Sequence, residues 1–428
     1  MLPARRRPQL LAEYADIMPP EGERRAEILE TAARMFASSG LRTSLKEIAD
    51  ACGIQAGSLY HHFASKEAII IELVQRYQDE LDRLAKDALN ALHDPGDDIE
   101  VLIVAFGRAI AACGVRNRAA LLLTLYEPPT VLGEELVRLA RQTPTAIDSA
   151  MLDLLRAGRD SGTIRPGVDL ELLAVRLCQS MLHVGVGVSH LSASGQRVPD
   201  LRLRILLHGL ARWMPSRRAL DRSGALRAAR QVIDTWNDDG DEPDRSARLR
   251  AVARVEFGRR GYEATTIRDI AAAGGLSTGT VYRYFGSKDE LLASIMRSYW
   301  GKFTTAWDAV LGSWSSPLEK LDALTLVNIN VIDRFTDEFK IQLAWLRQSP
   351  PSSPNLWFSF LSQLRQVRHL LAAGSRAGEI HLDGGPADVR ARCVFEAIFM
   401  PEHIVRAAGT RAAHGLARDT VLAGAATR

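Results

Sequence analysis

The chain has 428 residues, of which 46% are hydrophobic and 25% are charged, and its formal net charge is +3 at pH 7. This length predicts more than one domain, and the proportions are ordinary for a globular protein. No stretch approaches the roughly 18 unbroken apolar residues of a membrane-spanning helix, and the N-terminal residues lack the pattern of a secretory signal. We therefore expect a cytoplasmic protein without a membrane partner.

Motifs of catalysis and of metal binding are missing from the sequence. The four cysteines lie far apart without a CxxC pair, which argues against a disulfide framework and against a zinc knuckle. No GxSxG, HExxH or GxxxxGK pattern occurs. The sequence predicts neither an enzyme nor a metal or cofactor site.

The first predicted elements are three short helices within residues 23–69. Apolar residues recur at helical spacing from Arg24 to Ser39, which predicts the first helix. Ser44 followed by Glu47 has the spacing of a capping box, so a second helix is expected to begin there. A Gly-containing turn leads to a third helix at about residues 56–63, which carries polar side chains. Two helices joined in this way predict a helix-turn-helix unit.

The same pattern returns near residue 245. Between residues 45–67 and residues 267–289, nine of 23 positions are identical at a constant offset of 222. The predicted capping box also recurs, at Thr266 and Asp269. The chain is therefore predicted to contain two copies of one unit.

Each copy is followed by a long segment of predicted helices, so the fold class is expected to be all-α, with two tandem units of a three-helix head and a helical body. The predicted helices include segments near residues 169–190 and 200–214, and near 386–406 and 411–426. The predicted division is a basic arm at 1–22, a first helix-turn-helix domain at 23–69, a first helical regulatory domain at 70–215, a linker at 216–244, a second helix-turn-helix domain at 245–291 and a second regulatory domain at 292–428.

The residue types on the two predicted recognition helices suit DNA binding, because a helix fits the major groove, which is about 12 Å wide. Hydrogen-bonding side chains are available for base edges or phosphates, and Lys66 and Lys288 follow at the start of the next helix. Gly57 and Gly279 permit close approach to a DNA backbone. The hydrogen-bonding candidates are Gln55, Ser58, Tyr60, His61, His62, Ser277, Thr278, Thr280, Tyr282, Arg283 and Tyr284.

The stretches "TSLKEIADACGIQAGSLYHHFASKEAI" and "TTIRDIAAAGGLSTGTVYRYFGSKDEL" resemble the DNA-binding signature of TetR-type transcriptional regulators. This resemblance implies a DNA-binding head on a body that binds a small ligand and dimerises, usually with one head per chain. It further implies groove contacts by Ser58, Tyr60, His61, His62, Thr280, Tyr282, Arg283 and Tyr284, and phosphate contacts by Thr43, Ser44, Lys66, Thr265, Thr266 and Lys288. The family's mode of pairing implies that the helices near residues 169–190, 200–214, 386–406 and 411–426 form a four-helix interface within the chain. With two heads, this chain is expected to act as a covalent pseudo-dimer that represses from an asymmetric promoter operator.

The sequence leaves three alternatives to a pseudo-dimer with two DNA-binding heads. Residues 23–67 contain six basic and six acidic residues, whereas residues 245–289 contain nine and four. Gln55 also replaces the Ser or Thr expected ahead of a recognition helix, as at Ser277. One alternative is therefore a regulator in which only the second head reads DNA. The others are a homodimer of two chains on a palindrome and a non-specific architectural DNA-binding protein.

The effector is predicted to be small and apolar or amphipathic, and a lipid-like molecule is one candidate. Aromatic residues are concentrated in the second body, where their helical spacing favours core positions. The alternative is an apolar pocket lined by Trp345, Trp357 and Phe360, with a smaller site at Tyr126 or His183 in the first body. The run from Arg5 to Arg7 is interpreted either as an arm that contacts DNA or as a disordered tail.

Overall fold

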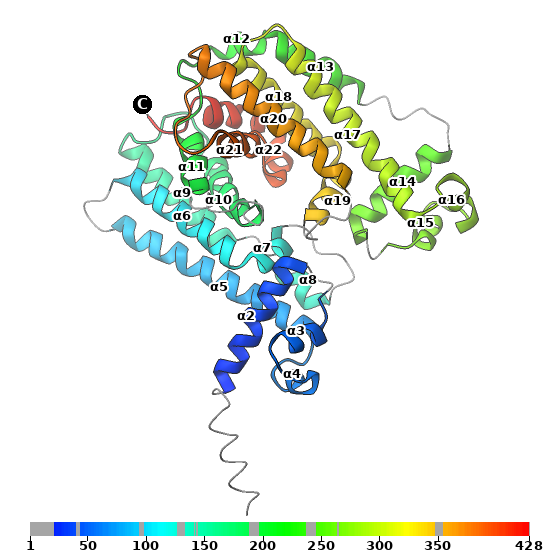
Figure 1. Ribbon diagram of the computed structural model, residues 1–428. Helices are drawn as coiled ribbons and strands as arrows, with labels where there is room; N and C mark the ends of the chain where they lie inside the picture. Colours follow the sequence, from blue (N-terminus) through cyan, green and yellow to red (C-terminus); the bar gives the residue numbers. More distant parts are fainter. Residues whose placement is uncertain are drawn as a thin grey trace, which may run out of the picture.

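The computed structural model describes residues 21–39, 43–93, 98–125, 133–140, 142, 144–187, 197–236, 245–262, 265–346 and 354–427. Across these ranges the regular structure is helical, and β-structure is limited to two isolated bridges, which confirms the predicted all-α class (Figure 1). None of the helices described combines the length and the apolar character that a bilayer crossing requires. The predicted arm at 1–22 lies almost wholly outside these ranges.

The first unit contains ten helices in the part of the chain described. They are α2 (Glu21–Ser39), α3 (Leu45–Ala51), α4 (Ala56–His62), α5 (Lys66–His93), α6 (Ile99–Arg116), α7 (Arg118–Leu125), α8 (Glu134–Ala140), α9 (Thr145–Asp160), α10 (Leu170–Gly187) and α11 (Val198–His208). The rest of the chain supplies α12 (Arg217–Asp221), α13 (Gly224–Thr235), α14 (Arg245–Arg260), α15 (Ile267–Ala273), α16 (Thr278–Tyr284), α17 (Lys288–Gly312), α18 (Pro317–Arg334), α19 (Thr336–Leu346), α20 (Pro354–Arg376), α21 (Ala387–Ala397), α22 (Glu402–Ala417) and the π-helix η5 (Arg418–Leu422).

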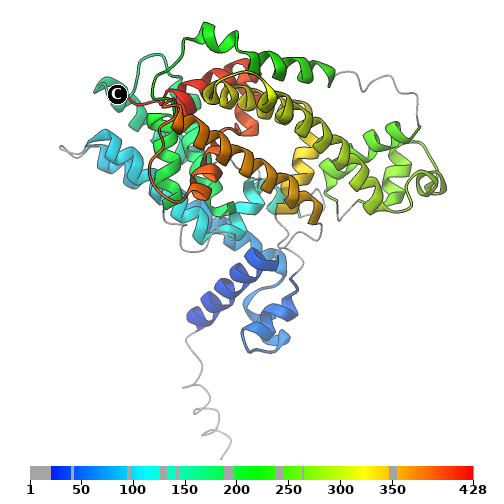
Figure 2. The same cartoon turned by 45° about the horizontal axis from the view of Figure 1, so that its top comes forward.

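Each head is a three-helix unit, α2–α4 in the first and α14–α16 in the second. The predicted capping boxes start α3 at Ser44 and α15 at Thr266. In the first head, Ile28, Ile48 and Leu59 from the three helices are fully buried together. Figures 1 and 2 show the two heads apart from each other, the blue one and the yellow-green one, on different sides of the joined bodies.

The second body has an aromatic core, as the helical spacing predicted. Phe303 packs on Trp307 with ring centroids 5.6 Å apart, and Phe395 packs on Phe399 at 5.1 Å. Trp307 is buried and donates from Nε1 to Asn328 Oδ1 at 3.1 Å. The prediction of a core position fails for Trp314, which is fully exposed in the loop between α17 and α18.

The predicted linker at 216–244 contains two helices. Helix α12 begins after Ser216, which caps it, and α13 buries Leu226, Ala229 and Ile233. This buried face of α13 packs against α17 and α18 of the second body. The segment Asn237 to Asp244 lies outside the described residues.

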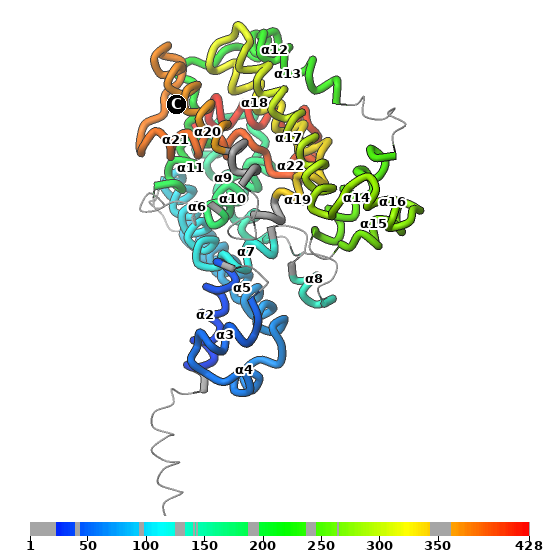
Figure 3. Tube along the Cα trace, turned by 45° about the vertical axis from the view of Figure 1, so that its right-hand side comes forward, coloured from blue at the N-terminus to red at the C-terminus, as the bar shows by residue number. Residues whose placement is uncertain are grey.

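The four helices predicted to form an interface within the chain pack against one another. Helix α11 contacts α21, and α10 contacts α22, which brings green and red parts of the chain together (Figure 3). Buried Arg176 of α10 donates to the backbone oxygen of Ala397 at 2.7 Å. Buried Arg202 of α11 donates to the backbone oxygen of Ser180 at 2.6 Å and pairs with Glu396. Helix faces that would otherwise be exposed are therefore covered within one chain.

The C-terminal residues 418–427, which we call the strap, join the second body to the first. The backbone N–H groups of Ala425 and Ala426 donate to the backbone oxygens of Leu206 and Leu207, at 3.1 and 2.7 Å. Arg165 donates through Nε to the backbone oxygen of Gly424 at 2.7 Å. Gly424 has φ 85°, and a Cβ there would lie 2.3 Å from the carbonyl carbon of His208. Only glycine fits this close crossing of two backbones.

Two helices end earlier than the sequence predicted. The helix expected to reach residue 214 ends at His208, because Gly209 has φ 71° and a Cβ there would lie 2.4 Å from the backbone oxygen of Leu422 in the strap. The helix expected to reach residue 406 ends at Ala397, and α22 begins after Pro401. Proline lacks the N–H that a helix interior requires.

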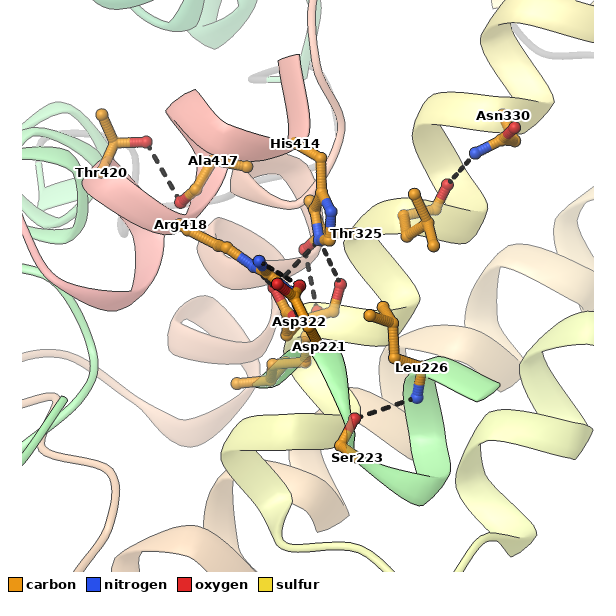
Figure 4. Close-up of polar contacts among 12 residues, drawn as sticks. Asp221, Ser223, Leu226, Asp322, Thr325, Asn330, His414, Ala417, Arg418 and Thr420 are labelled. Carbon is orange, nitrogen blue, oxygen red and sulfur yellow. Dashed lines mark hydrogen bonds and ion pairs between the residues drawn. The ribbon is translucent and has the colours of Figure 1, made fainter. Parts of the chain in front are cut away.

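A buried ion cluster fastens the strap to α18 (Figure 4). Arg418 donates to the Asp322 carboxylate from Nε at 2.8 Å and from Nη2 at 2.7 Å, and His414 Nε2 lies 2.9 Å from Asp322 Oδ1. Arg418 also donates to Asp221 of α12 at 2.8 Å. Burial alone would raise the pKa of Asp322, but hydrogen bonds from Arg418 and His414 hold it below its usual value. The Asp322 carboxylate is therefore charged at neutral pH.

Candidate nucleic-acid interface

The recognition helices α4 and α16 have seven residues each and the same inner face. Leu59 and Val281 occupy equivalent positions and are fully buried against their heads. Phe63 and Phe285 end the two helices and are also buried. This packing turns the remaining side chains outward.

The outer face of α4 is polar and exposed. Tyr60 is 56% exposed, Ser58 and His61 are exposed, and His62 is half-buried. Gln55 precedes the helix and makes no capping hydrogen bond, which confirms the expectation of a weaker cap. In the described ranges, no group of three His, Cys, Asp or Glu side chains is arranged to hold a metal ion.

The outer face of α16 carries a different set of side chains. Tyr282 is 54% exposed, almost as much as Tyr60, and Tyr284 is 37% exposed. The Arg283 guanidinium lies 5.5 Å from the centre of the Tyr284 ring, so these two side chains present a combined cationic and aromatic surface. Ser277 and Thr278 are exposed and Thr280 is half-buried. Ser277 caps the helix by accepting from the backbone N–H of Thr280.

Gly57 and Gly279 stand on the exposed faces, and the protein leaves room for a side chain at both. A Cβ at Gly57 would meet no protein atom within 4 Å, and one at Gly279 would meet only Ser277 Oγ at 3.9 Å. Neither glycine has a positive φ. Internal packing and backbone conformation therefore do not require these glycines, whereas close approach of a second molecule would.

The predicted phosphate-binding residues fall into exposed and internal groups. Ser44 and Thr266 are exposed, and each is engaged with the acidic residue of its capping box. Thr43 and Thr265 are buried, and the Thr265 hydroxyl donates to the backbone oxygen of Gly261 at 2.8 Å. The structure thus brings Ser44 and Thr266 to the surface and keeps the side chains of Thr43 and Thr265 inside the heads.

The two lysines also have internal partners. Lys288 donates from Nζ to the backbone oxygens of Tyr262 and Thr265, at 2.8 and 2.9 Å, and lies 4.2 Å from the centre of the Tyr262 ring. It fastens the loop ahead of α15, a role that no local sequence signal indicates. Lys66 is half-buried, and its partial burial lowers its pKa, while Glu47 opposes this shift.

One of the predicted ligand-binding residues, His183, lies in the described part of the chain. Tyr126 and the side chains of Trp345, Trp357 and Phe360 lie outside the described residues. His183 lies on α10, where Nδ1 is 2.7 Å from the backbone oxygen of Gln179. Desolvation by the surrounding protein lowers its pKa to about 4. The imidazole is therefore neutral at physiological pH.

Comparison with known proteins decides the family. The family model "Bacterial regulatory proteins, tetR family" matches residues 28–73 and 249–295, which are the two heads. The HTH-type transcriptional repressor KstR2 of Rhodococcus jostii is 32% identical over 191 residues, which cover 44% of this chain and 91% of that protein. The chain belongs to the TetR family. It is a DNA-binding regulator of transcription with two TetR-type heads.

Two further similarities of this TetR-family chain are to KstR2 of Mycobacterium tuberculosis, one in sequence and one in a solved structure. The KstR2 repressor of Mycobacterium tuberculosis is 33% identical over 151 residues, which cover 35% of this chain and 74% of that protein. The solved structure of the ketosteroid transcriptional regulator KstR2 of that organism covers 42% of this chain and 97% of its own, with a TM-score of 0.37 and 22% identity. TetR-family regulators are in general non-enzymatic.

Proposed function

We propose that one chain is a complete operator-binding unit, a pseudo-dimer that represses transcription from an asymmetric operator. The observation that carries the proposal is the interface within the chain, where α10 and α11 pack on α21 and α22. In the usual arrangement of the family, helices of two chains form such an interface. Here the same chain supplies both sides, so a single polypeptide presents two heads.

The unlike recognition helices support an asymmetric operator. Where α4 offers His61 and His62, α16 offers Arg283 and Tyr284. A guanidinium binds guanine through two hydrogen bonds, whereas imidazole rings cannot reproduce that fork. Two heads with different donor and acceptor patterns prefer two different half-sites.

We also propose that a small apolar or amphipathic effector releases the chain from DNA. Both bodies are helical bundles, and each long helix that follows a head, α5 or α17, extends from that head into the body. A ligand that shifts either bundle would move its head and change the spacing between the two recognition helices. Tyr126, His183, Trp345, Trp357 and Phe360 remain the predicted contacts.

We propose the same four domains that the sequence predicted, at 23–69, 70–215, 245–291 and 292–428. One helix of the predicted linker is added to the last of them. Helix α13 packs along α17 and α18 and contributes buried side chains to the second body. We therefore assign α13 to the second regulatory domain, and only residues 237–244 serve as a linker between that helix and the second head.

Tyr60 and Tyr282 provide a matched test of whether both heads bind DNA. The two side chains have almost equal exposure at equivalent positions, and a Phe substitution removes only the hydroxyl. A hydrogen bond to a charged phosphate contributes about 1.5–3 kcal/mol, so Tyr60→Phe and Tyr282→Phe should each weaken operator binding by about tenfold or more. Fluorescence anisotropy with the full operator measures both affinities.

The two affinities distinguish a regulator in which both heads bind DNA from one in which only the second head does. If Tyr60→Phe retains the affinity of the unaltered protein while Tyr282→Phe loses it, only the second head reads DNA. A non-specific architectural protein would bind operator and competitor DNA equally as salt is raised. Circular dichroism of both variants serves as the control for folding.

A further inference from the structure

A hollow of about 450 Å³ lies at the junction of the two bodies, within the size range of small-molecule sites. Arg204, His208 and Arg212 line it from α11 and the turn that follows. His381 and Asp383 line it from the segment between α20 and α21. Any molecule in this hollow would contact both bodies.

The two walls are held together by backbone hydrogen bonds. The N–H of Arg212 donates to the backbone oxygen of Glu379 at 2.8 Å, and that of His381 donates to the backbone oxygen of Leu210 at 2.9 Å. An isolated antiparallel bridge joins Ala211 to Ile380. Hydrogen-bonded backbone from both bodies therefore bounds the hollow.

Positive charge exceeds negative charge among the lining residues. Two guanidinium groups, those of Arg204 and Arg212, accompany one carboxylate, that of Asp383. Asp383 already lies 3.1 Å from His381 Nε2, and its backbone oxygen accepts from Arg204 Nη1 at 3.2 Å. Such a lining favours an anion that can accept hydrogen bonds from guanidinium groups.

A histidine and an arginine at the same spacing bind a carboxylate in the second half of the chain. The pentapeptide His-Gly-Leu-Ala-Arg occurs twice, at residues 208–212 and 414–418. In the second copy, His414 and Arg418 hold the carboxylate of Asp322 between them, as Figure 4 shows. In the first copy, the equivalent His208 and Arg212 both line the hollow, and His208 Nε2 lies 2.9 Å from Glu100 Oε1.

The two His-Gly-Leu-Ala-Arg pentapeptides differ in conformation. His414 and Arg418 lie on one continuous helical stretch, whereas α11 ends at His208 and the chain turns at Gly209. The turn lets the backbone of Leu422 pass close to Gly209. As a result, the chain after α11 runs along the second body and lines a surface hollow with Arg212.

We propose that this hollow binds a small anion through a carboxylate or phosphate group, with Arg204 and Arg212 as the main contacts. None of the lining residues belongs to a head or is one of the predicted effector contacts. Because its walls come from the two bodies, the bound anion stabilises their association. The test needs no DNA, so its result does not depend on the proposed operator.

The test titrates the full chain with inorganic phosphate, pyrophosphate, acetate and citrate, with chloride at equal ionic strength as the reference. Isothermal calorimetry measures affinity, and hydrogen exchange locates the site. We expect saturable binding of at least one probe and slower exchange at residues 204–212 and 379–383. Binding of the phosphates alone identifies a phosphate group as the ligand chemistry, and binding of the carboxylates alone identifies a carboxylate.

Matched variants decide where the anion binds. The double variant Arg204→Gln with Arg212→Gln should weaken binding at least tenfold, and the two single variants provide the same test if the double variant folds poorly. Arg218→Gln with Arg222→Gln removes two exposed arginines elsewhere and should retain the affinity. Equal affinity in the Arg204 and Arg212 variants, slower exchange confined to the heads, or no saturable binding overturns the proposal.

Discussion

At the scale of single residues, the two heads differ in chemistry while sharing their packing. Leu59 and Val281 are buried alike, whereas Arg283 replaces His61 on the outer face. Most of the outward side chains are exposed, so packing within the head restricts their identity little. DNA specificity is therefore expected to depend on these positions.

Gly57 and Gly279 allow the proposed DNA contact to be tested without damage to the fold. Because space for a Cβ exists at both, Gly57→Ala and Gly279→Ala should each stabilise the helix by about 0.5–1 kcal/mol. On DNA, the same methyl group would push against the backbone, and affinity should fall at least about tenfold. Thermal melting and anisotropy measure the two effects. Unchanged affinity in both variants would contradict a close approach at these helices.

Asp148 provides a prediction of pH-dependent stability. Burial raises its pKa from 3.8 to about 6, although a hydrogen bond from Cys178 opposes the shift. Its Oδ1 has no hydrogen-bond partner among the described residues. A carboxyl with a raised folded-state pKa contributes stability below pH 3.8, and this contribution is lost as the pH rises to about 6.

The substitution Asp148→Asn removes this cost of ionisation. At pH 7.5 it should stabilise the protein by about 2–3 kcal/mol, since one pKa unit corresponds to about 1.4 kcal/mol, and at pH 4 by less than about 1 kcal/mol. Urea unfolding at the two pH values measures the difference. Asp153→Asn, on the same helix but more exposed, should show no such gain. An equal gain for Asp148→Asn at both pH values would disprove the role of ionisation.

At the scale of helices, the sequence was most informative where the signal is local. Capping boxes at Ser44 and Thr266 and a Gly-containing turn predicted the heads almost to the residue. The end of α11 depends on the strap, which approaches Gly209 from more than 200 residues away in the chain. The hydrogen bonds from Lys288 to the loop ahead of α15 also depend on tertiary contacts. Local sequence patterns could therefore reveal neither the end of α11 nor the role of Lys288.

The strap can be tested with two glycines of similar φ. Gly424 has φ 85° and no room for a Cβ, whereas Gly162 has φ 81° and no atom within 4 Å of a Cβ. Gly162→Ala should cost about 1–2 kcal/mol of backbone strain. Gly424→Ala adds a backbone clash and should lower thermal stability further, with faster hydrogen exchange at residues 205–211. Equal effects of the two substitutions would contradict a tight crossing at the strap.

At the scale of the whole molecule, the proposed pseudo-dimer depends on the pairing of two bodies within one chain. Arg176, Arg202 and the strap connect the bodies across α10, α11, α21 and the C-terminal residues. A second chain is not needed to cover these surfaces. Local sequence patterns predicted the positions of these helices, and the family resemblance predicted their pairing. The polar contacts that join them became visible only in the structure.

The most direct test of the pseudo-dimer is to select bound sequences from random DNA with the purified protein and to measure the mass of the complex on the best site. For a pseudo-dimer, we expect the complex to contain one chain bound to two half-sites of different sequence. Two chains on a palindrome, with equal dependence on both halves, would contradict it, although the chain would still be a DNA-binding regulator.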